Sequence, residues 1–546
     1  MKSGKQRLDP KPETTPAIKI AESPGAIGTA VAANLWPTLA VIGAIVLLHL
    51  YTNGRYGFFP DELQFMSDAR RLDWGFVAYP PVAPFLARVS TAIFGISLAG
   101  LRLFPTLAQA AALLLVSQMA RELGGGRLAQ ATAALAIGLS PYPLYEGMLF
   151  QYTQFDYLVW VLLAYFVIRL LNSDDGRWWL AIGAAEGFGL LTKYTVAYLI
   201  AGMFCGMLLT RARRYLRSPW FWGGQALALI IFLPNVIWQF RHDFISYTFI
   251  QFIHSRDVSK GLTDGFLAEQ FVLCVSPLAA PLCLAGLIGY VRNPRYRMIG
   301  WMFIAPLVLF VVTKGRSYYL APTYPMLAAM GAVMGERWIN SISNTSASRK
   351  EARLRHESAK PGWPAERTGR QWIAATYLIG LMLWGASVCM VVLPLQSKGW
   401  LRDLAMKRSA FLRDEFGWND LVRTVAGIRD SLPSDEKPGV GVIVDDYGEE
   451  GAVEILGSSY RLPEPISTIN SGWLRGYPSP APTPLIVVGF SRDMAAAEFS
   501  GCKLAGQNGN SEGIQNDESE QHPDIFLCSS PRQSWPEFWK DSPHFE

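Results

Sequence analysis

The chain has 546 residues, of which 50% are hydrophobic, and a formal net charge of +5. The basic residues lie in short loops beside apolar stretches, and no DNA- or RNA-binding motif is present, so the charge does not indicate a nucleic-acid partner. Walker A, HExxH and GxSxG motifs and a His/Cys cluster are also missing from the sequence, which argues against ATP-driven transport and zinc hydrolysis.

Apolar segments alternate with short charged loops, and their length suits a hydrocarbon core of ~30 Å. Tryptophans such as Trp36, Trp178 and Trp220 stand at segment ends, as in a membrane-interface belt. The sequence therefore predicts an α-helical polytopic membrane protein. Its eleven predicted segments are 35–52, 98–120, 128–145, 153–171, 178–192, 194–210, 219–240, 267–290, 298–313, 319–336 and 372–394.

The loop charges predict the orientation of these segments. If residues 1–34 form a cytoplasmic tail, every loop on the same side carries lysine or arginine, as the positive-inside rule requires. The loops on that side are 121–127, 172–177, 211–218, 291–297 and 337–371. This alternation requires a break between two segments at Lys193, because a single element over 178–210 would invert all later loops. An odd number of crossings then places the region 395–546 outside.

Three outside pieces are too long to be simple turns: 53–97, 241–266 and 395–546. The last is long enough for a domain with its own core beside the membrane domain 35–394. Strand-like runs at Val440–Val444, Leu485–Phe490 and Ile525–Cys528 and a helical pattern at Ala410–Asp430 predict an α/β domain there. The inside loop 337–371, rich in serine, arginine and glutamate, is predicted to be disordered.

An acidic pair, Asp61 and Glu62, follows the first segment. Carboxylates at the membrane surface suit a general base that accepts a proton from an attacking hydroxyl. A structural alternative is equally open, in which Asp61 caps a helix that starts at Glu62.

Asp156 lies at the outer end of the fourth segment, where a carboxylate close to hydrocarbon usually has a partner or a role. We favour a functional role for it over a position in the headgroup layer. Glu146 is interpreted as an exposed loop residue. Glu186 lies within the fifth segment, and the sequence does not identify its partner.

Lys193, Lys314 and Arg316 lie in outside turns, against the usual distribution of basic residues. Basic side chains there suit phosphate oxygens, whereas the alternative is that they extend toward lipid headgroups. For a lone lysine such as Lys193 the alternative is favoured. Lys314 and Arg316, followed by Tyr318 and Tyr319, favour phosphate contact.

The six cysteines fall into two groups. Cys205, Cys274, Cys283 and Cys389 lie in apolar segments and are interpreted as packing residues. Cys502 and Cys528 lie in the polar C-terminal region, where an extracytoplasmic location would allow a disulfide between them.

Several stretches spread over nearly the whole chain share one family pattern. They are YGFFPDELQFMSDARRLDWGFVAYPPVAPFLA from Tyr56 to Ala87, Gln154–Arg169 with Arg177–Leu180 and Gly187–Tyr194, KGRSYYLAPTYPMLA from Lys314 to Ala328, and Val444–Ala452, Arg461–Pro465 and Cys528–Trp539. Together they resemble bacterial glycosyltransferase family 39, which is similar to protein O-mannosyltransferases and to the aminoarabinose transferase that modifies lipid A.

The resemblance implies a GT-C fold of about eleven transmembrane helices, with the outside loop 53–97 over the site and a periplasmic C-terminal α/β domain. It also implies a polyprenyl-phosphate-linked sugar as donor and inversion of the anomeric centre. By position, Asp61 would be the general base on the acceptor hydroxyl, and Asp156 the second acidic position. The predicted catalytic set is Asp61, Glu62 and Asp156, and the predicted donor-phosphate set is Lys193, Lys314, Arg316, Tyr318 and Tyr319.

The substrate loop implied by the resemblance contains Tyr79, Pro80 and Pro81. The sequence departs from the family at Ala78–Pro81, because many relatives carry an acid and then a polar residue or lysine before the prolines.

These features predict an inverting membrane glycosyltransferase in a bacterial inner membrane, with its active site facing the periplasm. The acceptor would be a lipid, a glycan or a protein, and the sequence leaves the sugar and any divalent metal open. The alternative is a transporter or lipid flippase, which would predict inverted repeats and broken mid-membrane helices. No internal repeat relates the two halves of the sequence.

Overall fold

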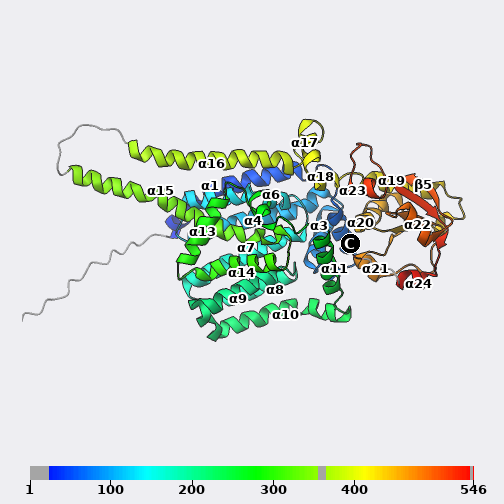
Figure 1. The fold of residues 1–546 in the computed structure, drawn as a ribbon, viewed down its shortest axis with the longest axis horizontal. Coiled ribbons are helices and arrows are strands. Elements are labelled where there is room, and N and C mark those ends of the chain that lie inside the picture. Colours follow the sequence, from blue (N-terminus) through cyan, green and yellow to red (C-terminus); the bar gives the residue numbers. More distant parts are fainter. Residues whose placement is uncertain (1–23, 355–364, 541–544, 546) are drawn as a thin grey trace, which may run out of the picture.

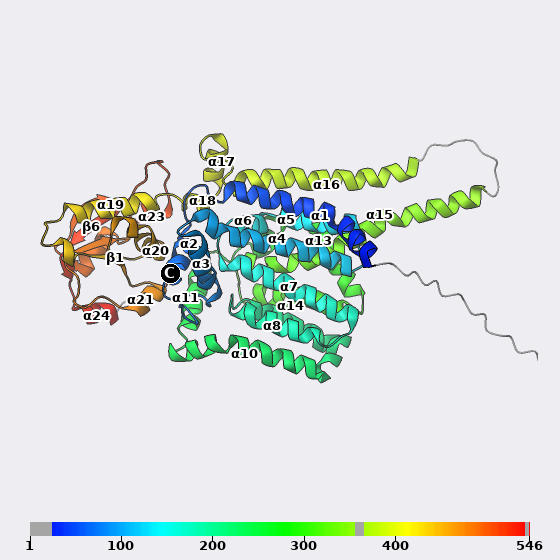
Figure 2. The ribbon, with the colours of Figure 1, turned by 180° about the vertical axis from the view of Figure 1, so that it is seen from behind.

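The computed structural model describes residues 24–354, 365–540 and 545, so most of the predicted cytoplasmic tail, residues 1–23, lies outside the described residues. A long helical bundle forms the middle of the molecule, and an α/β region lies at one of its ends (Figure 1). Helices α15 and α16 extend beyond the bundle at the opposite end (Figure 2).

The bundle contains most of the predicted membrane segments. Its helices are α1 (Pro24–Thr52), α4 (Leu98–Glu122), α5 (Arg127–Gly138), α6 (Pro141–Glu146), α7 (Tyr152–Ser173), α8 (Trp178–Leu190), α9 (Val196–Leu209), α10 (Pro219–Arg241), α12 (Phe266–Glu269), α13 (Ala280–Arg292), α14 (Arg297–Val312), α15 (Tyr324–Leu354) and α16 (Ala365–Val392). Each predicted segment falls on one or more of them. The break at Lys193 is confirmed, because α8 ends at Leu190 and α9 begins at Val196.

Five helices within the described residues are long and apolar enough to span a membrane: α1, α4, α7, α10 and α16. A sixth span arises if α9 and the bent turn Arg211–Arg217 count as one, whereas α13 and α14 are shorter apolar helices. The predicted segment 128–145 is split into α5 and α6 because Pro141 starts a new helix. Eleven crossings therefore stay a prediction.

The basic loops predicted to lie inside meet at one end of the bundle. Arg337 donates to the carbonyl of Leu123 at 2.8 Å, and Arg295 donates to the carbonyl of Asn172 at 2.7 Å. Arg214 pairs with Asp174. These contacts join loop 337–371 to loop 121–127, and loops 291–297 and 211–218 to loop 172–177, in agreement with their predicted location on one side.

The stretch 337–371 differs from the prediction of disorder. Helix α15 continues to Leu354 and α16 begins at Ala365, while residues 355–364 lie outside the described residues. A composition poor in apolar residues argues against a packed core, but alanine, glutamate, arginine and lysine all favour helix locally. The helices of the bundle therefore continue into this stretch.

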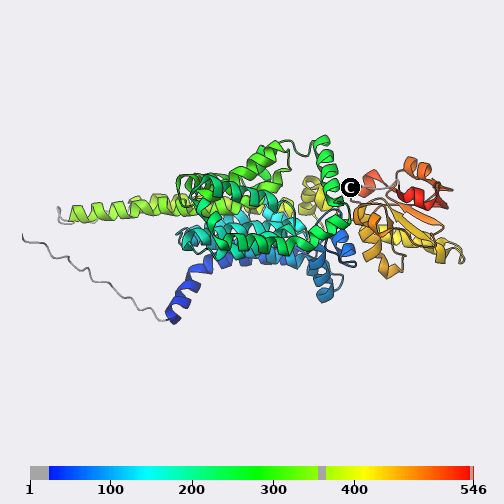
Figure 3. The same cartoon turned by 90° about the horizontal axis from the view of Figure 1, so that it is seen from below.

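The opposite end of the bundle is covered by the outside pieces (Figure 3). Loop 53–97 forms α2 (Pro60–Asp68) and α3 (Val82–Phe94), and the second outside piece forms α11 (Ile245–Ser259). Ser246 donates to the carbonyl of Phe76 at 3.0 Å, and Trp238 donates to Asp73 at 2.8 Å, so these pieces lie together.

The C-terminal region contains a five-stranded sheet in the order β2-β1-β3-β6-β5, in which β1 is parallel to β2 and β3. The strands are β1 (Gly441–Val444), β2 (Ile466–Ser467), β3 (Leu485–Val488), β5 (Lys503–Gln507) and β6 (Asp524–Cys528), with a separate pair β4 (Phe499–Ser500) and β7 (Ser530–Pro531). All three predicted strands are present. The helices are α17 (Trp400–Arg408), α18 (Ala410–Arg413), α19 (Trp418–Ser431), α20 (Tyr447–Ile455), α21 (Asn470–Arg475), α22 (Arg492–Glu498), α23 (Asp517–Gln521) and α24 (Trp535–Lys540).

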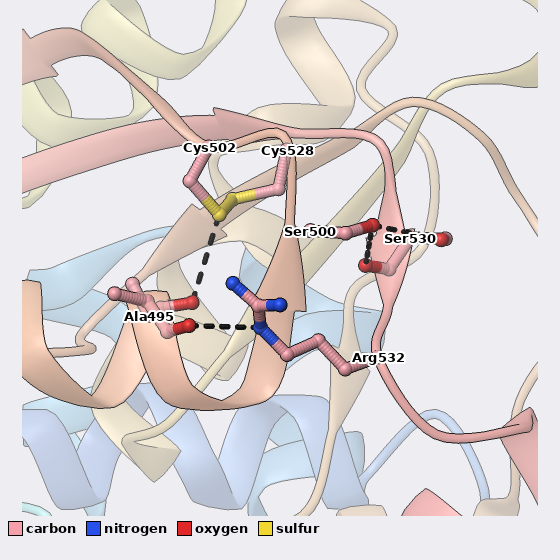
Figure 4. Close-up of a disulfide and its surroundings, with 7 residues drawn as sticks. Ala495, Ser500, Cys502, Cys528, Ser530 and Arg532 are labelled. Atoms are coloured by element: carbon pink, nitrogen blue, oxygen red, sulfur yellow. Dashed lines mark hydrogen bonds between the residues drawn. A yellow bond between two sulfur atoms is a disulfide. The ribbon is translucent and has the colours of Figure 1, made fainter.

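A disulfide joins Cys502 and Cys528, whose Cα atoms are 4.0 Å apart, so the pairing inferred from their location is present. It lies beside the β4–β7 pair, where the hydroxyls of Ser500 and Ser530 are 3.2 Å apart (Figure 4). Of the other four cysteines, Cys205 is partly exposed and the rest are buried, in agreement with a packing role.

The C-terminal region packs on α2 through a common apolar core. Leu63 and Phe65 of α2 belong to the same buried cluster as Val425 of α19, Val444 of β1 and Val453 of α20. Helix α2 therefore lies between the bundle and the sheet, and its residues Glu62 and Asp68 are buried by this arrangement.

Candidate active site

Asp61 lies in the first turn of helix α2, and the N-cap of this helix is another residue. Phe59 is the N-cap, Pro60 takes the first helical position, and the side chain of Glu62 accepts from the backbone N–H of Phe59 at 2.9 Å. The interpretation of Asp61 as the cap is therefore wrong. The Asp61 carboxylate instead accepts hydrogen bonds from the Gln151 side-chain amide and from the Tyr447 hydroxyl.

The surroundings of Asp61 suit a base that works near neutral pH. The pKa of Asp61 is raised to about 6, mainly by burial; the hydrogen bonds from Tyr447 and Gln151 oppose this increase, and the nearby carboxylates of Asp446 and Glu62 add to it. A base is most effective when its pKa lies close to the working pH. Asp61 is thus mostly ionised at pH 7 and able to take a proton.

Glu62 is fully buried and is held by four hydrogen bonds. Arg102 of α4 donates to it from Nε at 2.8 Å and from Nη2 at 2.9 Å. The N–H groups of Phe150 and Phe59 donate at 3.0 and 2.9 Å. Arg102 also pairs with Glu415 at 3.3 Å. This geometry supports a structural role for Glu62 next to Asp61, and its catalytic role stays a prediction.

Asp156 lies near the start of α7 and is buried, and both of its carboxylate oxygens accept hydrogen bonds. Oδ1 accepts from the indole N–H of Trp160 at 3.0 Å, and Oδ2 accepts from the hydroxyl of Thr195 at 3.0 Å. It lies close enough to Lys193 for their charges to attract. Asp156 therefore orients and balances the charge of a buried lysine.

Lys193 is only 9% exposed and is surrounded by aromatic rings. Its Nζ lies 4.7 Å from the ring centre of Tyr319, 4.9 Å from that of Tyr152 and 5.3 Å from that of Tyr318. Cation–π attraction holds the ammonium among these faces. A buried ammonium in a site of this kind is a strong partner for an anion, because the local dielectric is low.

Glu146 is a residue that the sequence interpretation missed. It is 5% exposed, belongs to the short helix α6 and accepts a hydrogen bond from Thr153. Its carboxylate lies within electrostatic range of both Lys193 and Asp61. Pro141 and Pro143 stand before it, and they were the available signal that the chain turns there.

Tyr318 and Tyr319 both lie next to Lys193. The two basic residues of the same turn, Lys314 and Arg316, differ in their distance from it. Arg316 lies within electrostatic range of Lys193, and its Nε and Nη2 both donate to Asp257 at 2.5 Å. Lys314 is exposed and lines a separate groove with Phe266, Leu267 and Phe310. The contact of Lys314 with the donor phosphate stays a prediction.

The loop at Tyr79, Pro80 and Pro81 is buried and belongs to the wall of the site. The Tyr79 hydroxyl donates to Asp68, and its ring lies 5.8 Å from that of Tyr152. Pro81 is the N-cap of α3. The departure from the family pattern at Ala78–Pro81 thus replaces polar groups by a closed aromatic and proline surface.

Two further predictions concern buried acids and metals. Glu186 of α8 accepts from Gln225 of α10 at 2.9 Å, which identifies its partner. In the part of the chain that the structure describes, no group of three or more His, Cys, Asp or Glu side chains is arranged to hold a metal ion.

The start of α7 brings the two halves of the site together. Gln151 donates to Asp61, and the next residue, Tyr152, contacts Lys193. A carboxylate with a pKa near neutral and a buried cation are therefore held by adjacent residues of one segment. This pairing suits a reaction in which a hydroxyl is deprotonated and an anionic group leaves.

The chain matches the family model described as dolichyl-phosphate-mannose-protein mannosyltransferase over residues 78–238. The lipid A galacturonosyltransferase RgtD of Rhizobium johnstonii is 28% identical to it over 289 residues, which cover 51% of this chain and 59% of RgtD. The matched region thus spans less than two thirds of that relative.

Two solved structures of ArnT from Cupriavidus metallidurans share the fold at 17% sequence identity. The structure bound to undecaprenyl phosphate gives a TM-score of 0.55 and the apo structure 0.56, and both alignments cover 92% of this chain and 98% of ArnT. The predicted GT-C fold is confirmed. Together, the family match, the relative and the shared fold support a GT-C membrane protein that resembles glycosyltransferase family 39.

Proposed function

We propose that the chain is an inverting glycosyltransferase that moves a sugar from a polyprenyl-phosphate donor to a hydroxyl of a lipid, glycan or protein acceptor. The observation that carries this proposal is that two adjacent residues contact the two charged groups. Gln151 donates a hydrogen bond to Asp61, and the ring of Tyr152 contacts the ammonium of Lys193. The activity of RgtD and the undecaprenyl phosphate bound to ArnT support this class of donor and acceptor chemistry.

The reaction is a single in-line displacement. Asp61 takes the proton of the acceptor hydroxyl, whose oxygen attacks the anomeric carbon of the sugar. The bond between that carbon and the phosphate oxygen breaks, and polyprenyl phosphate leaves with the electron pair. No acid is needed on the leaving group, because a phosphate monoester is already a stable anion.

Lys193 meets the charge that grows on the leaving phosphate. Preformed cations in a buried site stabilise a transition state more than they do in water. The charges of Asp156 and Glu146 and the rings of Tyr318 and Tyr319 hold the ammonium in place. Arg316 lies next to this set, with Asp257 as its partner in the described structure.

We infer that the site faces the periplasm of a bacterial inner membrane. The support is that Asp61, Lys193 and the sheet lie at the end of the bundle opposite the basic loops, and basic loops are typical of the cytoplasmic side. The disulfide Cys502–Cys528 agrees with an oxidising compartment.

The proposal is tested with purified protein in liposomes and radiolabelled polyprenyl-phosphate sugars, with lipid A, glycan and peptide acceptors. Wild type should transfer label, and Asp61→Asn should lower kcat by about 10²–10⁴-fold, the usual contribution of a general base. Asp73→Asn is the control, because Asp73 lies in the same outside loop and its carboxylate bonds to Trp238.

Transfer of label by Asp61→Asn at the wild-type rate would overturn the assignment of the base. Label that crosses the liposome membrane still attached to the polyprenyl carrier, without transfer to any acceptor, would support the transporter or flippase alternative instead.

A further inference from the structure

Tyr447 is the first residue of α20, and only Asp445 and Asp446 separate it from the carboxyl end of strand β1. Asp446 is the N-cap, and its carboxylate accepts from the N–H of Glu449 at 3.1 Å and from that of Gly448. An aspartate cap of this kind fixes where a helix begins and which way it runs. It therefore fixes the position from which the Tyr447 side chain extends.

Helix α20 lies unusually close to α2, and two glycines allow the approach. A Cβ on Gly448 would lie 3.0 Å from the Cβ of Pro60, and one on Gly451 would lie 2.5 Å from the carbonyl carbon of Leu63. Any larger residue at Gly451 would push the helices apart. This contact brings the Tyr447 hydroxyl within hydrogen-bond reach of Asp61.

The Asp61 carboxylate thus receives one donor from each part of the molecule. Gln151, at the start of α7, belongs to the bundle, and Tyr447 belongs to the C-terminal region. Two donors from different directions fix the plane of a carboxylate, whereas one donor leaves it free to rotate. Correct orientation of a catalytic group is a large part of enzymatic rate enhancement.

We propose that Tyr447 is a positioning residue for Asp61, so that the C-terminal region completes the active site when it docks on α2. The inference rests on the proposed function for its effect on catalysis. Its structural part is that the Tyr447 hydroxyl orients and stabilises the ionised Asp61. This part can be measured without an activity assay.

The charged and titratable groups around Asp61 determine the sign of the expected change. From the elements packed against it, these groups are Asp446, Tyr447, Glu62, Tyr79, Tyr145, Glu146 and Tyr152. The acidic neighbours favour protonation of Asp61, and the hydrogen bond from Tyr447 opposes it. Removal of the Tyr447 hydroxyl therefore raises the pKa of Asp61 above its value of about 6.

The test compares wild type with Tyr447→Phe, which keeps the ring. Infrared difference spectra with ¹³C-labelled aspartate isolate the Asp61 band as the one that Asp61→Asn removes. Its midpoint should rise by about one pH unit in Tyr447→Phe, as expected for the loss of a hydrogen bond to a carboxylate. The acid limb of the pH profile of kcat/KM should move to higher pH by the same amount. At a pH above the Asp61 pKa of both wild type and Tyr447→Phe, kcat of the variant should be about tenfold lower.

Two controls keep the test independent of folding. Tyr477→Phe changes a tyrosine of the same region whose ring stacks on Trp535 at 5.0 Å, and it should leave the Asp61 midpoint unchanged. If Tyr447→Phe does not fold, Tyr447→3-fluorotyrosine retains the shape but donates more strongly, and should lower the midpoint.

An Asp61 midpoint that is the same in wild type and the Tyr447 variants, or that moves equally in Tyr477→Phe, would overturn the inference. A wild-type protein that transfers no sugar would count against the proposed function alone, because the infrared shift would still show whether Tyr447 controls Asp61.

Discussion

Asp61 and Glu62 are adjacent in the chain but lie in different environments. Glu62 is enclosed by Arg102 and two backbone N–H groups, whereas Asp61 has two side-chain donors from Gln151 and Tyr447. Adjacent positions on a helix point about 100° apart, so one carboxylate faces the bundle and the other the site. The local sequence could identify the pair as important, but it could not separate a base from a structural ion pair.

The local sequence also failed to identify the importance of Lys193. A lone lysine in an outside turn was interpreted in favour of lipid headgroups, whereas Lys314 and Arg316 were favoured for phosphate. The structure buries Lys193 among three tyrosines and leaves Lys314 exposed. The difference depends on Tyr152 and Tyr318, which lie far from Lys193 in the sequence, and local charge patterning contains no information about such contacts.

Substitution of the two lysines separates these interpretations. Lys193→Met should lower kcat by about 10²–10³-fold, because a preformed charge on the leaving group is lost. Lys314→Met should stay within about twofold, as expected for an exposed charge. The measurement is sugar transfer in liposomes at saturating donor. Equal losses in both variants, or a larger loss for Lys314→Met, would instead favour the phosphate contact implied by the family resemblance.

At the scale of elements, the sequence predicted helices and strands well where apolar runs are long. The strands β1, β3 and β6 lie within the predicted runs, because buried strands are read from continuous apolar residues. The helical character of 337–354 was missed, because composition was used there in place of local helix propensity. The edge strand β5, Lys503–Gln507, was also missed, since it is largely exposed and has little apolar pattern.

Close packing of α8 on α10 depends on glycines that no hydrophobic pattern identifies. A Cβ on Gly183 would lie 2.0 Å from the carbonyl oxygen of Gly224, and a Cβ on Gly224 would lie 2.2 Å from that of Trp179. Small residues allow membrane helices to approach closely, and the Glu186–Gln225 hydrogen bond is formed across this contact.

Adjacent glycines of α10 provide a matched test of this packing. Gly224→Ala should destabilise the protein by about 1–3 kcal/mol, the usual cost of overpacking a close contact. Gly223→Ala should be neutral, because its Cβ would meet only Leu180 at 3.6 Å. Thermal unfolding in detergent measures both, and similar midpoints for the two variants would contradict the close helix contact.

For the whole molecule, the sequence placed the first outside loop and the C-terminal region on the same side but did not predict that they bind each other. Their contact depends on pairs such as Arg71 with Glu454 at 2.6 Å and Arg475 with Asp68, which are separated by 383 and 407 residues. One sequence gives no means to match charges over that distance. The location of the active site at this junction therefore required the fold.

Arg475 is the centre of this charged interface. It pairs with Asp68 of α2 and Glu450 of α20, both buried, and lies 3.7 Å from Glu454. Arg475→Met leaves Asp68 and Glu450 without their cation, whereas Glu454 keeps Arg71. Because removal of one partner of a buried ion pair typically costs about 3–5 kcal/mol, we expect the C-terminal region to detach from α2 or to unfold at a lower temperature.

Limited proteolysis of 395–546 and thermal unfolding measure this docking. Arg492→Met is the matched control, since the Arg492–Asp524 pair belongs to the same region but the arginine side chain is 69% exposed. Such exposed pairs contribute at most about 1 kcal/mol. If docking orients Asp61 through Tyr447, Arg475→Met should also raise the infrared midpoint of Asp61, as Tyr447→Phe does. Weakened docking with an unchanged midpoint would show that the interface stabilises the molecule without controlling its base.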